Sequence, residues 1–584
     1  MPNGRTITIT VQEGQQFDQC AGAVAKVDAD LCVNCGKCRN LCPTDTIDEF
    51  QRDICRLCPD CADSPTQFPE ESKRYAPKHA CSLACPLGTV PEGYINLIAE
   101  GKLELAYGLA RDLNPLPVVC SMICHHPCED ECKRGLLIDE PIAIRALKRF
   151  LTEEVEAPEL KFNQRYDRKI AVIGAGPAGL TAAADLAKKG YRVKIFEAGP
   201  APGGMMRKGI PDFRIDKDDM LDEIEELLDA GIEIEYECMV GLKPSINDLL
   251  DDKFEAVLIA TGAGQGSKLP IPGANAEKVY DAVAFMNRVN SRMPVDVGKQ
   301  AVVIGGGSVA MDTARTLRRL GVDDVTCAFV ETLECEKEGD VPAPAPLWEI
   351  DEAREEGVII VGSSAPVRIV ADWFTVQGVE FQKVKEITCD DNGLKFECEP
   401  GSEFTLDADT VVFATGQKAD VKTMAERNGL ELADSGALKF DEGTMATSNP
   451  RVFVAGDVVA ARGSVIDAMA AGRKAALSID NLLQNREITS RIHAKEAKTA
   501  PMNEKIYPAT HIEKTDPQAV PKDRFRDSFD LVEDVFDEYS AMLEARRCMK
   551  CGYSGVDAEK CIGCGVCAEA CPENAITLVQ ADSI

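Results

Sequence analysis

Cysteine is concentrated at the two ends of this 584-residue chain, which restricts how those ends can fold. Fourteen of the 25 cysteines lie in the first 132 residues and six in the last 37. Two runs have the spacing C-x2-C-x2-C-x3-C-P, and they are Cys32, Cys35, Cys38 and Cys42, and Cys561, Cys564, Cys567 and Cys571. This spacing is typical of loops that bind a 4Fe-4S cluster, whereas a zinc site normally uses two C-x2-C pairs separated by a longer segment. We therefore expect an iron-sulfur cluster at each run.

Between these ends lie two glycine-rich fingerprints, each of which follows an apolar strand and opens a helix. The first consists of Gly174, Gly176, Pro177 and Gly179, with Glu197 at the end of the next strand. The second consists of Gly305, Gly307, Ser308 and Ala310. Such glycines let the backbone approach a pyrophosphate at a helix N-terminus, and the acidic residue can bind ribose hydroxyls. The pattern predicts two dinucleotide sites.

Length, charge and hydropathy narrow the class of protein further. The chain is too long for a single core. It contains no run of about 18 apolar residues, so no membrane span is predicted. The net charge of -32 argues against nucleic acid or an anionic membrane as partner. Many cysteines without an export signal favour a reducing compartment, so we expect a cytoplasmic protein.

The order of predicted elements indicates an α/β protein with two Rossmann-like domains, one inserted in the other, a helical iron-sulfur domain before them and ferredoxin-like modules at both ends. The expected domains are 1–50 and 546–584 for the ferredoxin-like modules, 51–165 for the helical domain, 166–290 and 409–484 for the first dinucleotide domain, 291–408 for the second, and 485–545 for a linker and helix. An apolar stripe from Phe529 to Met542 predicts that last helix, with Ser528 as its cap.

A third group of cysteines carries a family resemblance. Cys81 and Cys85 precede Cys120, Cys124, Cys128 and Cys132, which recur every four residues, although Pro127 favours a compact loop over one helix. The segment NPLPVVCSMICHHPCEDECKRG, followed by PIAIRALKRF, resembles the glutamate synthase small subunit. That family includes the large subunit of NADH-dependent ferredoxin:NADP oxidoreductase and the N-terminal part of dihydropyrimidine dehydrogenase. The resemblance extends from about Cys55 to about Ile479.

The resemblance implies two interleaved 4Fe-4S clusters in the helical domain. One would take Cys58, Cys61, Cys81 and Cys132, and the other Cys85, Cys124, Cys128 and a fourth ligand. Lys148 matches the Gln or Glu that ligates in some members; because an ammonium is a poor ligand, Cys120 is the candidate. Whether Cys55 replaces Cys61, and whether Cys20, Cys548 and Cys551 are ligands, stays open. We expect four clusters in all and leave a fifth open.

The first dinucleotide is expected to be FAD. The turns Thr261-Gly262, Thr415-Gly416 and Gly456-Asp457 resemble those of two-dinucleotide flavoproteins, whose last aspartate binds the FAD ribityl-pyrophosphate region, and Gly204 lies in a similar flavin-side segment. Thr415 and Gly416 are assigned to the second site, which should bind a nicotinamide cofactor.

The choice between NAD(H) and NADP(H) depends on Val330 and Glu331, which stand where this family typically has two arginines for the 2'-phosphate of NADP. Two unit charges about 4 Å apart interact by about 4 kcal/mol at an effective dielectric near 20. The sequence therefore predicts NAD(H), with a Glu331 that points into solvent as the alternative.

These features predict an iron-sulfur flavoprotein oxidoreductase subunit that passes electrons between NADH, FAD and 4Fe-4S clusters. No acid-base side chain is required for hydride transfer, and no cysteine pair near the flavin has the spacing of a disulfide reductase. The family suggests ferredoxin, a hydrogenase, a formate dehydrogenase or a second flavoprotein as partner in a hetero-oligomer, with electron bifurcation by analogy. The alternatives are an NADPH-dependent glutamate synthase small subunit and a non-catalytic wiring scaffold.

Overall fold

The computed structural model describes most of the chain between residues 81 and 490. Described residues are 6–10, 16–20, 23–27, 47–51, 54–55, 81–241, 243–333, 340–373, 375–390, 393–433, 436–459, 463–490, 498–499, 507–508, 512–515, 528–556 and 576–580. They form two compact units, the first made of 1–159, 492–518 and 535–584, and the second of 160–491 and 519–534. Ten predicted ligands lie outside the described residues: Cys32, Cys35, Cys38, Cys42, Cys58, Cys61, Cys561, Cys564, Cys567 and Cys571.

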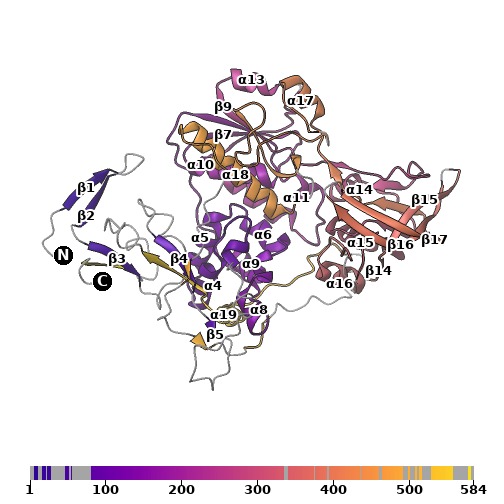
Figure 1. The fold of residues 1–584 in the computed structure, drawn as a ribbon, viewed down its shortest axis with the longest axis horizontal. Helices are drawn as coiled ribbons and strands as arrows, with labels where there is room; N and C mark the ends of the chain where they lie inside the picture. The colour runs from indigo at the N-terminus through magenta and orange to yellow at the C-terminus, as the bar shows by residue number, and fades with distance from the viewer. Residues whose placement is uncertain are drawn as a thin grey trace. The chain divides into compact units, whose positions relative to one another are not determined.

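The second unit contains a five-stranded parallel sheet built around the first fingerprint (Figure 1). Its strand order is β20 (Val452–Val454), β9 (Phe254–Ile259), β6 (Lys169–Ile173), β7 (Arg192–Phe196) and β8 (Glu233–Glu235). The central strands are apolar runs, as expected where both faces of a parallel sheet are covered.

Helices α10 (Pro177–Lys188) and α18 (Val465–Leu483) pack against each other in this domain. A Cβ atom at Gly472 would collide with the carbonyl oxygen of Ala178, so the contact requires glycine. Ser464 and Asp467 form a capping box at the start of α18. The other helices of this region are α11 (Met205–Lys208), α12 (Lys217–Asp229), α13 (Ile246–Asp251), α17 (Lys422–Asn428) and the 3-10 turn η1 (Gly456–Val458).

A second five-stranded parallel sheet surrounds the second fingerprint. Its order is β11 (Val279–Asp281), β18 (Thr410–Phe413), β12 (Gln300–Ile304), β13 (Asp324–Ala328) and β14 (Val358–Val361), with helices α14 (Ala282–Asn290), α15 (Ser308–Arg319) and α16 (Leu347–Glu355). The predicted boundaries put 279–281 and 410–413 in the first dinucleotide domain. The structure places both strands in the second sheet, because β18 pairs in parallel with β12 and with β11.

Two smaller sheets complete the second unit. Strands β15 (Ser364–Asp372), β16 (Thr375–Asp390) and β17 (Gly393–Asp407) form an antiparallel sheet, which is absent from the predicted domains. Strands β10 (Gln265–Gly266) and β19 (Gln417–Lys418) pair where the chain passes into and out of the second domain.

The first unit contains a helical domain, as predicted from its cysteine-rich segment. Its helices are α3 (Cys81–Ala84), α4 (Pro91–Ala99), α5 (Leu103–Leu113), α6 (Pro117–Ile123), α7 (Pro127–Asp130), α8 (Lys133–Leu137), α9 (Ile144–Glu154) and α19 (Glu538–Arg546). Pro127 opens α7, so the four regularly spaced cysteines lie on short helices and turns, as the proline predicts. Tyr94, Leu147 and Phe536 belong to a shared apolar core.

Helix α19 corrects one prediction. The helix expected from Ser528 onward begins instead at Glu538, where the Asp537 side chain accepts a hydrogen bond from the Ser540 amide. Phe529 packs against Phe213 within the second unit, whereas Phe536 is buried in the helical domain of the first. The apolar stripe therefore belongs to two different cores.

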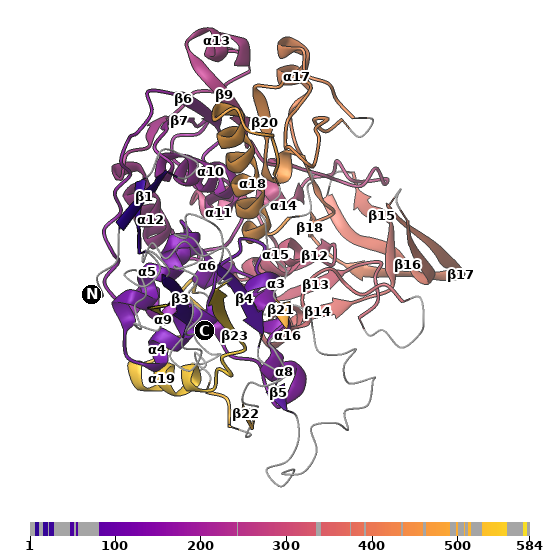
Figure 2. The ribbon, with the colours of Figure 1, turned by 60° about the vertical axis from the view of Figure 1, so that its left-hand side comes forward.

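Short strands from both ends of the chain pair within the first unit. They are β1 (Thr6–Thr10), β2 (Gln16–Cys20), β3 (Ala23–Val27), β4 (Ile47–Gln51), β5 (Ile54–Cys55), β21 (Lys498–Thr499), β22 (Tyr507–Pro508), β23 (Gly552–Val556) and β24 (Ile576–Gln580). Strand β4 lies between β21 and β23 (Figure 2), and β3 pairs with β24. Across the parts of the chain that the structure describes, every helix is too short or too polar to cross a membrane.

Candidate dinucleotide and iron-sulfur sites

The first fingerprint lies at the carboxyl end of β6, where its glycines allow close approach. Gly174 has a φ of +106°, and a Cβ there would lie 2.5 Å from the carbonyl oxygen of Ala260 at the end of β9. A Cβ at Gly179 would collide with the carbonyl oxygen of Gly174. Gly176 caps α10 and Pro177 occupies its first turn, so free amides face the space beyond the sheet, where a pyrophosphate can bind.

Glu197 lies beside this loop at the end of β7 and is 7% exposed. Its Oε2 accepts a hydrogen bond from the Ala175 amide (2.9 Å), and its Oε1 accepts one from the Gly199 amide (2.8 Å). Gly204 lies against the fingerprint as well, because a Cβ on it would be 2.9 Å from the Cα of Gly176. The structure therefore brings the predicted flavin-side residues together around one loop.

Three further predicted residues border the same end of the first sheet. Thr261 and Gly262 follow β9, and Gly456 lies in η1, where a Cβ would be 2.9 Å from the Cβ of Ala178 in α10. Burial, reinforced by the nearby Asp467, raises the pKa of Asp457 to about 6, although the Gly463 amide lowers it. Hydrogen-bond donors on a bound ligand would favour the ionised form of Asp457.

The second fingerprint repeats this geometry at the carboxyl end of β12. Gly305 has a φ of +143°, and a Cβ on it would collide with the carbonyl oxygen of Ala414, just after β18. Gly307 caps α15, Ser308 begins it, and Ala310 is fully buried.

Thr415 and Gly416 follow β18 and hydrogen-bond to the segment that enters the second domain. The Thr415 hydroxyl donates to the Ser267 carbonyl (2.9 Å), and the Ser267 amide donates to the Gly416 carbonyl (3.0 Å). They therefore lie just beyond the carboxyl end of β18, an interior strand of the second sheet.

Glu331 packs against the second fingerprint. Its Oε2 lies 3.2 Å from the position that a Cβ on Gly306 would occupy, and Phe329 covers the same glycine. The side chain is half-buried, and burial raises the pKa of its carboxyl group, while its own backbone amide lowers it. This position beside Gly306 favours a carboxylate that faces the fingerprint over one that points into solvent.

An ionic network around Arg214 connects the two dinucleotide domains, and no sequence motif predicts it. Arg214, from the segment GIPDFRI at 209–215, contacts Asp312 of α15 and Glu349 of α16, each at 2.9 Å. Burial alone would lower the pKa of Arg214, but the two carboxylates raise it. The guanidinium of Arg319 stacks 3.9 Å from the ring centre of Phe213. The Arg214 cation, paired with one buried carboxylate from each of these helices, fixes the flavin-side segment against the second domain.

Four cysteines of the helical domain lie near enough to Lys148 of α9 to interact with its charge. The group consists of Cys85, Cys120, Cys124 and Cys128, the set predicted to hold one cluster with Cys120 as the fourth member. Burial would lower the pKa of Lys148, but the nearby thiolates outweigh that effect and raise it. The Thr89 hydroxyl donates to the Cys85 sulfur (3.1 Å), and the His126 amide donates to the Cys124 sulfur (3.4 Å). Donors of this kind stabilise thiolate charge.

A second group of four cysteines lines a small cavity in the same domain: Cys81, Cys132, Cys548 and Cys551. The remaining lining residues are Glu92, Ile95, Lys133, Arg134, Ile142, Ile144 and Met549. Burial raises the pKa of the Cys548 thiol to about 12. All four thiols are free of disulfides. Sequence spacing gave no reason to join residues 81 and 132 to residues more than 400 positions away.

Three family models match the chain. Pyridine nucleotide-disulphide oxidoreductase matches residues 168–475, dihydropyrimidine dehydrogenase domain II with its 4Fe-4S cluster matches 63–159, and the 4Fe-4S binding domain matches 25–48 and 555–577. These matches confirm the predicted α/β dinucleotide-binding fold with added iron-sulfur modules, and with it binding of FAD and NAD(P).

Curated relatives agree with the family models. The β subunit of NADP(+)-dependent formate dehydrogenase from Moorella thermoacetica is 34% identical over 514 residues, which are 81% of this chain and 70% of that one. The NAD-dependent dihydropyrimidine dehydrogenase subunit PreT from Salmonella typhimurium is 33% identical over 69% of this chain and 91% of its own. The Escherichia coli glutamate synthase [NADPH] small chain is 31% identical over 69% of this chain and 88% of its own.

Among solved structures, FprA from Mycobacterium tuberculosis in complex with NADPH aligns with a TM-score of 0.47 at 19% identity, over 57% of this chain and 88% of that one. The family models and curated relatives together confirm the resemblance read from the cysteine and glycine motifs. The chain therefore belongs to the pyridine nucleotide-disulphide oxidoreductase family, among its iron-sulfur flavoprotein subunits related to the glutamate synthase small chain, PreT and the formate dehydrogenase β subunit.

Proposed function

We propose that this oxidoreductase uses NADH rather than NADPH and exchanges electrons between the nicotinamide cofactor, FAD and its 4Fe-4S clusters. The observation that carries the cofactor preference is the carboxylate of Glu331 packed beside Gly306. A 2'-phosphate carries about -1.5 to -2 charges near pH 7, and a carboxylate beside the fingerprint repels it. The ribose hydroxyl of NAD(H) can instead donate a hydrogen bond to that carboxylate.

The chain's own residues contribute placement rather than acid-base chemistry. The fingerprint backbones and Glu197 would hold the two dinucleotides at the carboxyl ends of their sheets, and the Arg214 network fixes the flavin-side segment against α15 and α16. FAD, when bound, is the group that can accept a hydride and release single electrons. Holding the reacting groups in one geometry supplies much of the rate enhancement of such a transfer.

We further propose that the protein works as one subunit of a larger cytoplasmic complex with ferredoxin, a hydrogenase, a formate dehydrogenase or a second flavoprotein. Several relatives are named as subunits, which supports partnership without identifying the partner. The added cysteine runs at 32–42 and 561–571 favour electron exchange with another redox protein. Bifurcation remains a proposal by analogy alone.

A glutamate synthase small subunit is the second candidate, supported by the 31% identity to the Escherichia coli chain. Glu331 and the added cysteine runs count against it, and the two intact fingerprints count against a non-catalytic scaffold. The test is anaerobic flavin bleaching by NADH and by NADPH at equal concentrations. Faster bleaching by NADH is the expected result. A preference for NADPH contradicts the proposal, and a protein without flavin supports the scaffold instead.

A further inference from the structure

The C-terminal pair Cys548 and Cys551 lies beside two cysteines of the helical domain. Cys81 begins α3, Cys132 caps α8, and the pair follows α19 directly, yet all four line one cavity. Cys81 and Cys548 pack against the same apolar core that contains Cys132. Folding therefore gathers four thiols from three distant stretches of chain.

We propose that Cys81, Cys132, Cys548 and Cys551 are the four ligands of one 4Fe-4S cluster. The C-terminal segment would then supply the two ligands that the family resemblance takes from Cys58 and Cys61. The assignment is independent of the proposed NADH preference and of the proposed partners, because it depends only on which thiols share a site.

The donor set fits a cubane better than a single ion. Four cysteine thiolates are the usual ligands of a 4Fe-4S cluster, and each binds a different iron, so the sulfurs stand farther apart than around one metal. Ile95, Ile142 and Ile144 supply an apolar wall, and Lys133 supplies positive charge. Arg134 is paired with Asp139, and the buried Glu92 adds a negative charge to the same lining.

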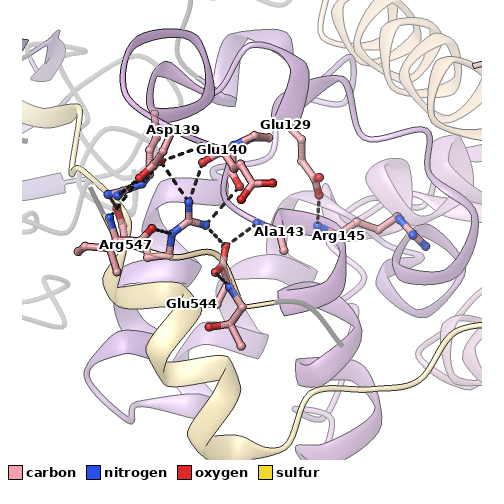
Figure 3. A network of polar contacts seen from close by, with 11 residues as sticks. Glu129, Asp139, Glu140, Ala143, Arg145, Glu544 and Arg547 are labelled. Carbon is pink, nitrogen blue, oxygen red and sulfur yellow. Dashed lines mark hydrogen bonds and ion pairs between the residues drawn. The ribbon is translucent and has the colours of Figure 1, made fainter. Parts of the chain in front are cut away.

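A buried polar network holds the C-terminal segment at this position (Figure 3). Arg547, which is 1% exposed, donates to Glu544 Oε1 (2.7 Å), Asp139 Oδ1 (3.2 Å) and the Glu140 carbonyl (2.8 Å). Arg134 donates to the carbonyl of Arg547 itself (2.8 Å). The residue directly before Cys548 is thus tied to the residue two positions after Cys132.

The backbone between the two C-terminal cysteines is also specifically arranged. The Cys548 amide donates a hydrogen bond to the Ala545 carbonyl (3.1 Å) at the C-terminal end of α19. Lys550 has a φ of +50°, in the left-handed region that a non-glycine residue adopts only where the surroundings impose it. This turn directs both thiols of the C-x2-C pair into the cavity that Cys81 and Cys132 line.

The test compares three double variants of the full-length protein, purified anaerobically. Cys81→Ala with Cys132→Ala identifies the electron paramagnetic resonance signal of this cluster, because both competing assignments require those two ligands. Cys548→Ala with Cys551→Ala should lose the same signal and about four irons per FAD. Cys58→Ala with Cys61→Ala should keep that signal. Cys398→Ala, which changes a cysteine in β17 outside every proposed site, is the control and should retain full iron content.

Two results would overturn the assignment. One is a Cys548/Cys551 variant that keeps the signal and its full iron content, and the other is a Cys58/Cys61 variant that loses the signal. FAD content and the thermal unfolding midpoint report whether each variant folds. If the Cys548/Cys551 variant does not fold, the Cys58/Cys61 variant alone decides, since the two ligand sets predict opposite results for it.

Discussion

Glu331→Gln should reduce discrimination against NADPH, because it removes a charge while keeping the size and hydrogen-bonding capacity of the side chain. Two unit charges about 4 Å apart interact by about 4 kcal/mol at a dielectric near 20, and by about 1 kcal/mol in bulk water. Glu331 is half-buried beside Gly306, so an intermediate value of about 2 to 3 kcal/mol is appropriate. That range corresponds to a change of about 30-fold to 150-fold in the ratio of kcat/KM for NADH to that for NADPH.

The assay is steady-state reduction of an artificial one-electron acceptor, with each nicotinamide varied in turn. Glu386→Gln removes the same charge from an exposed position on β16, and it should leave the ratio unchanged. A Glu331→Gln ratio within twofold of the wild-type ratio, or a wild-type preference for NADPH, would refute the reasoning.

The pH dependence gives a second readout on Glu331. Burial raises the pKa of this carboxyl group, so the group becomes neutral at a higher pH than an exposed glutamate does. As pH falls, protonation removes the repulsion, and protonation of the 2'-phosphate, near pH 6, acts in the same direction. Discrimination against NADPH should therefore weaken as pH falls. In the Glu331→Gln variant, only the part of this pH dependence that comes from protonation of the phosphate should remain.

Three further predictions concern stability and can be checked by denaturant unfolding. Arg214→Met leaves two buried carboxylates without their cation and should cost about 3 to 5 kcal/mol, whereas Arg354→Ala breaks an exposed pair and should cost less than about 1 kcal/mol. Gly472→Ala should destabilise by about 1 to 3 kcal/mol through its collision with α10, while Gly108→Ala, which meets no atom within 4 Å, should stabilise α5 by about 0.5 to 1 kcal/mol. Asp457→Asn should stabilise the apoprotein by about 1 to 3 kcal/mol at pH 7. The pKa of Asp457 in the folded protein is about 6, so the wild-type protein loses stability as pH rises through that value, and the Asn variant does not. A gain in stability that persists below about pH 4 would contradict this reasoning.

The dinucleotide domains were predictable because their signals are local. Each fingerprint lies within about 30 residues of its strand, helix and acidic residue, and the structure places these parts as expected. The strand at 410–413 was assigned to the wrong sheet for a physical reason. Its apolar sequence suits either buried parallel sheet, and only its pairing with β12 decides between them.

The helix predicted from Ser528 failed because helical periodicity was read across a boundary between two cores. Phe529 packs on Phe213 in the second unit, and Phe536 is buried in the first. The spacing of these residues fits one helical face by coincidence. Likewise, Cys548 and Cys551 carried no local signal for their site, because their neighbours Cys81 and Cys132 are more than 400 residues away along the chain.

That separation has a consequence for how the protein folds. The second unit is almost continuous in sequence, from 160 to 491, whereas the first is completed by 535–584. The cost of closing a loop grows only slowly with its length, and a folded second unit reduces the length of flexible chain that must be closed. The buried contacts of Arg547 with residues 139–140 then offset the remaining cost. We therefore expect the second unit to fold before the four-cysteine cavity forms, so that insertion of a cluster at Cys548 and Cys551 is a late step that requires the complete chain.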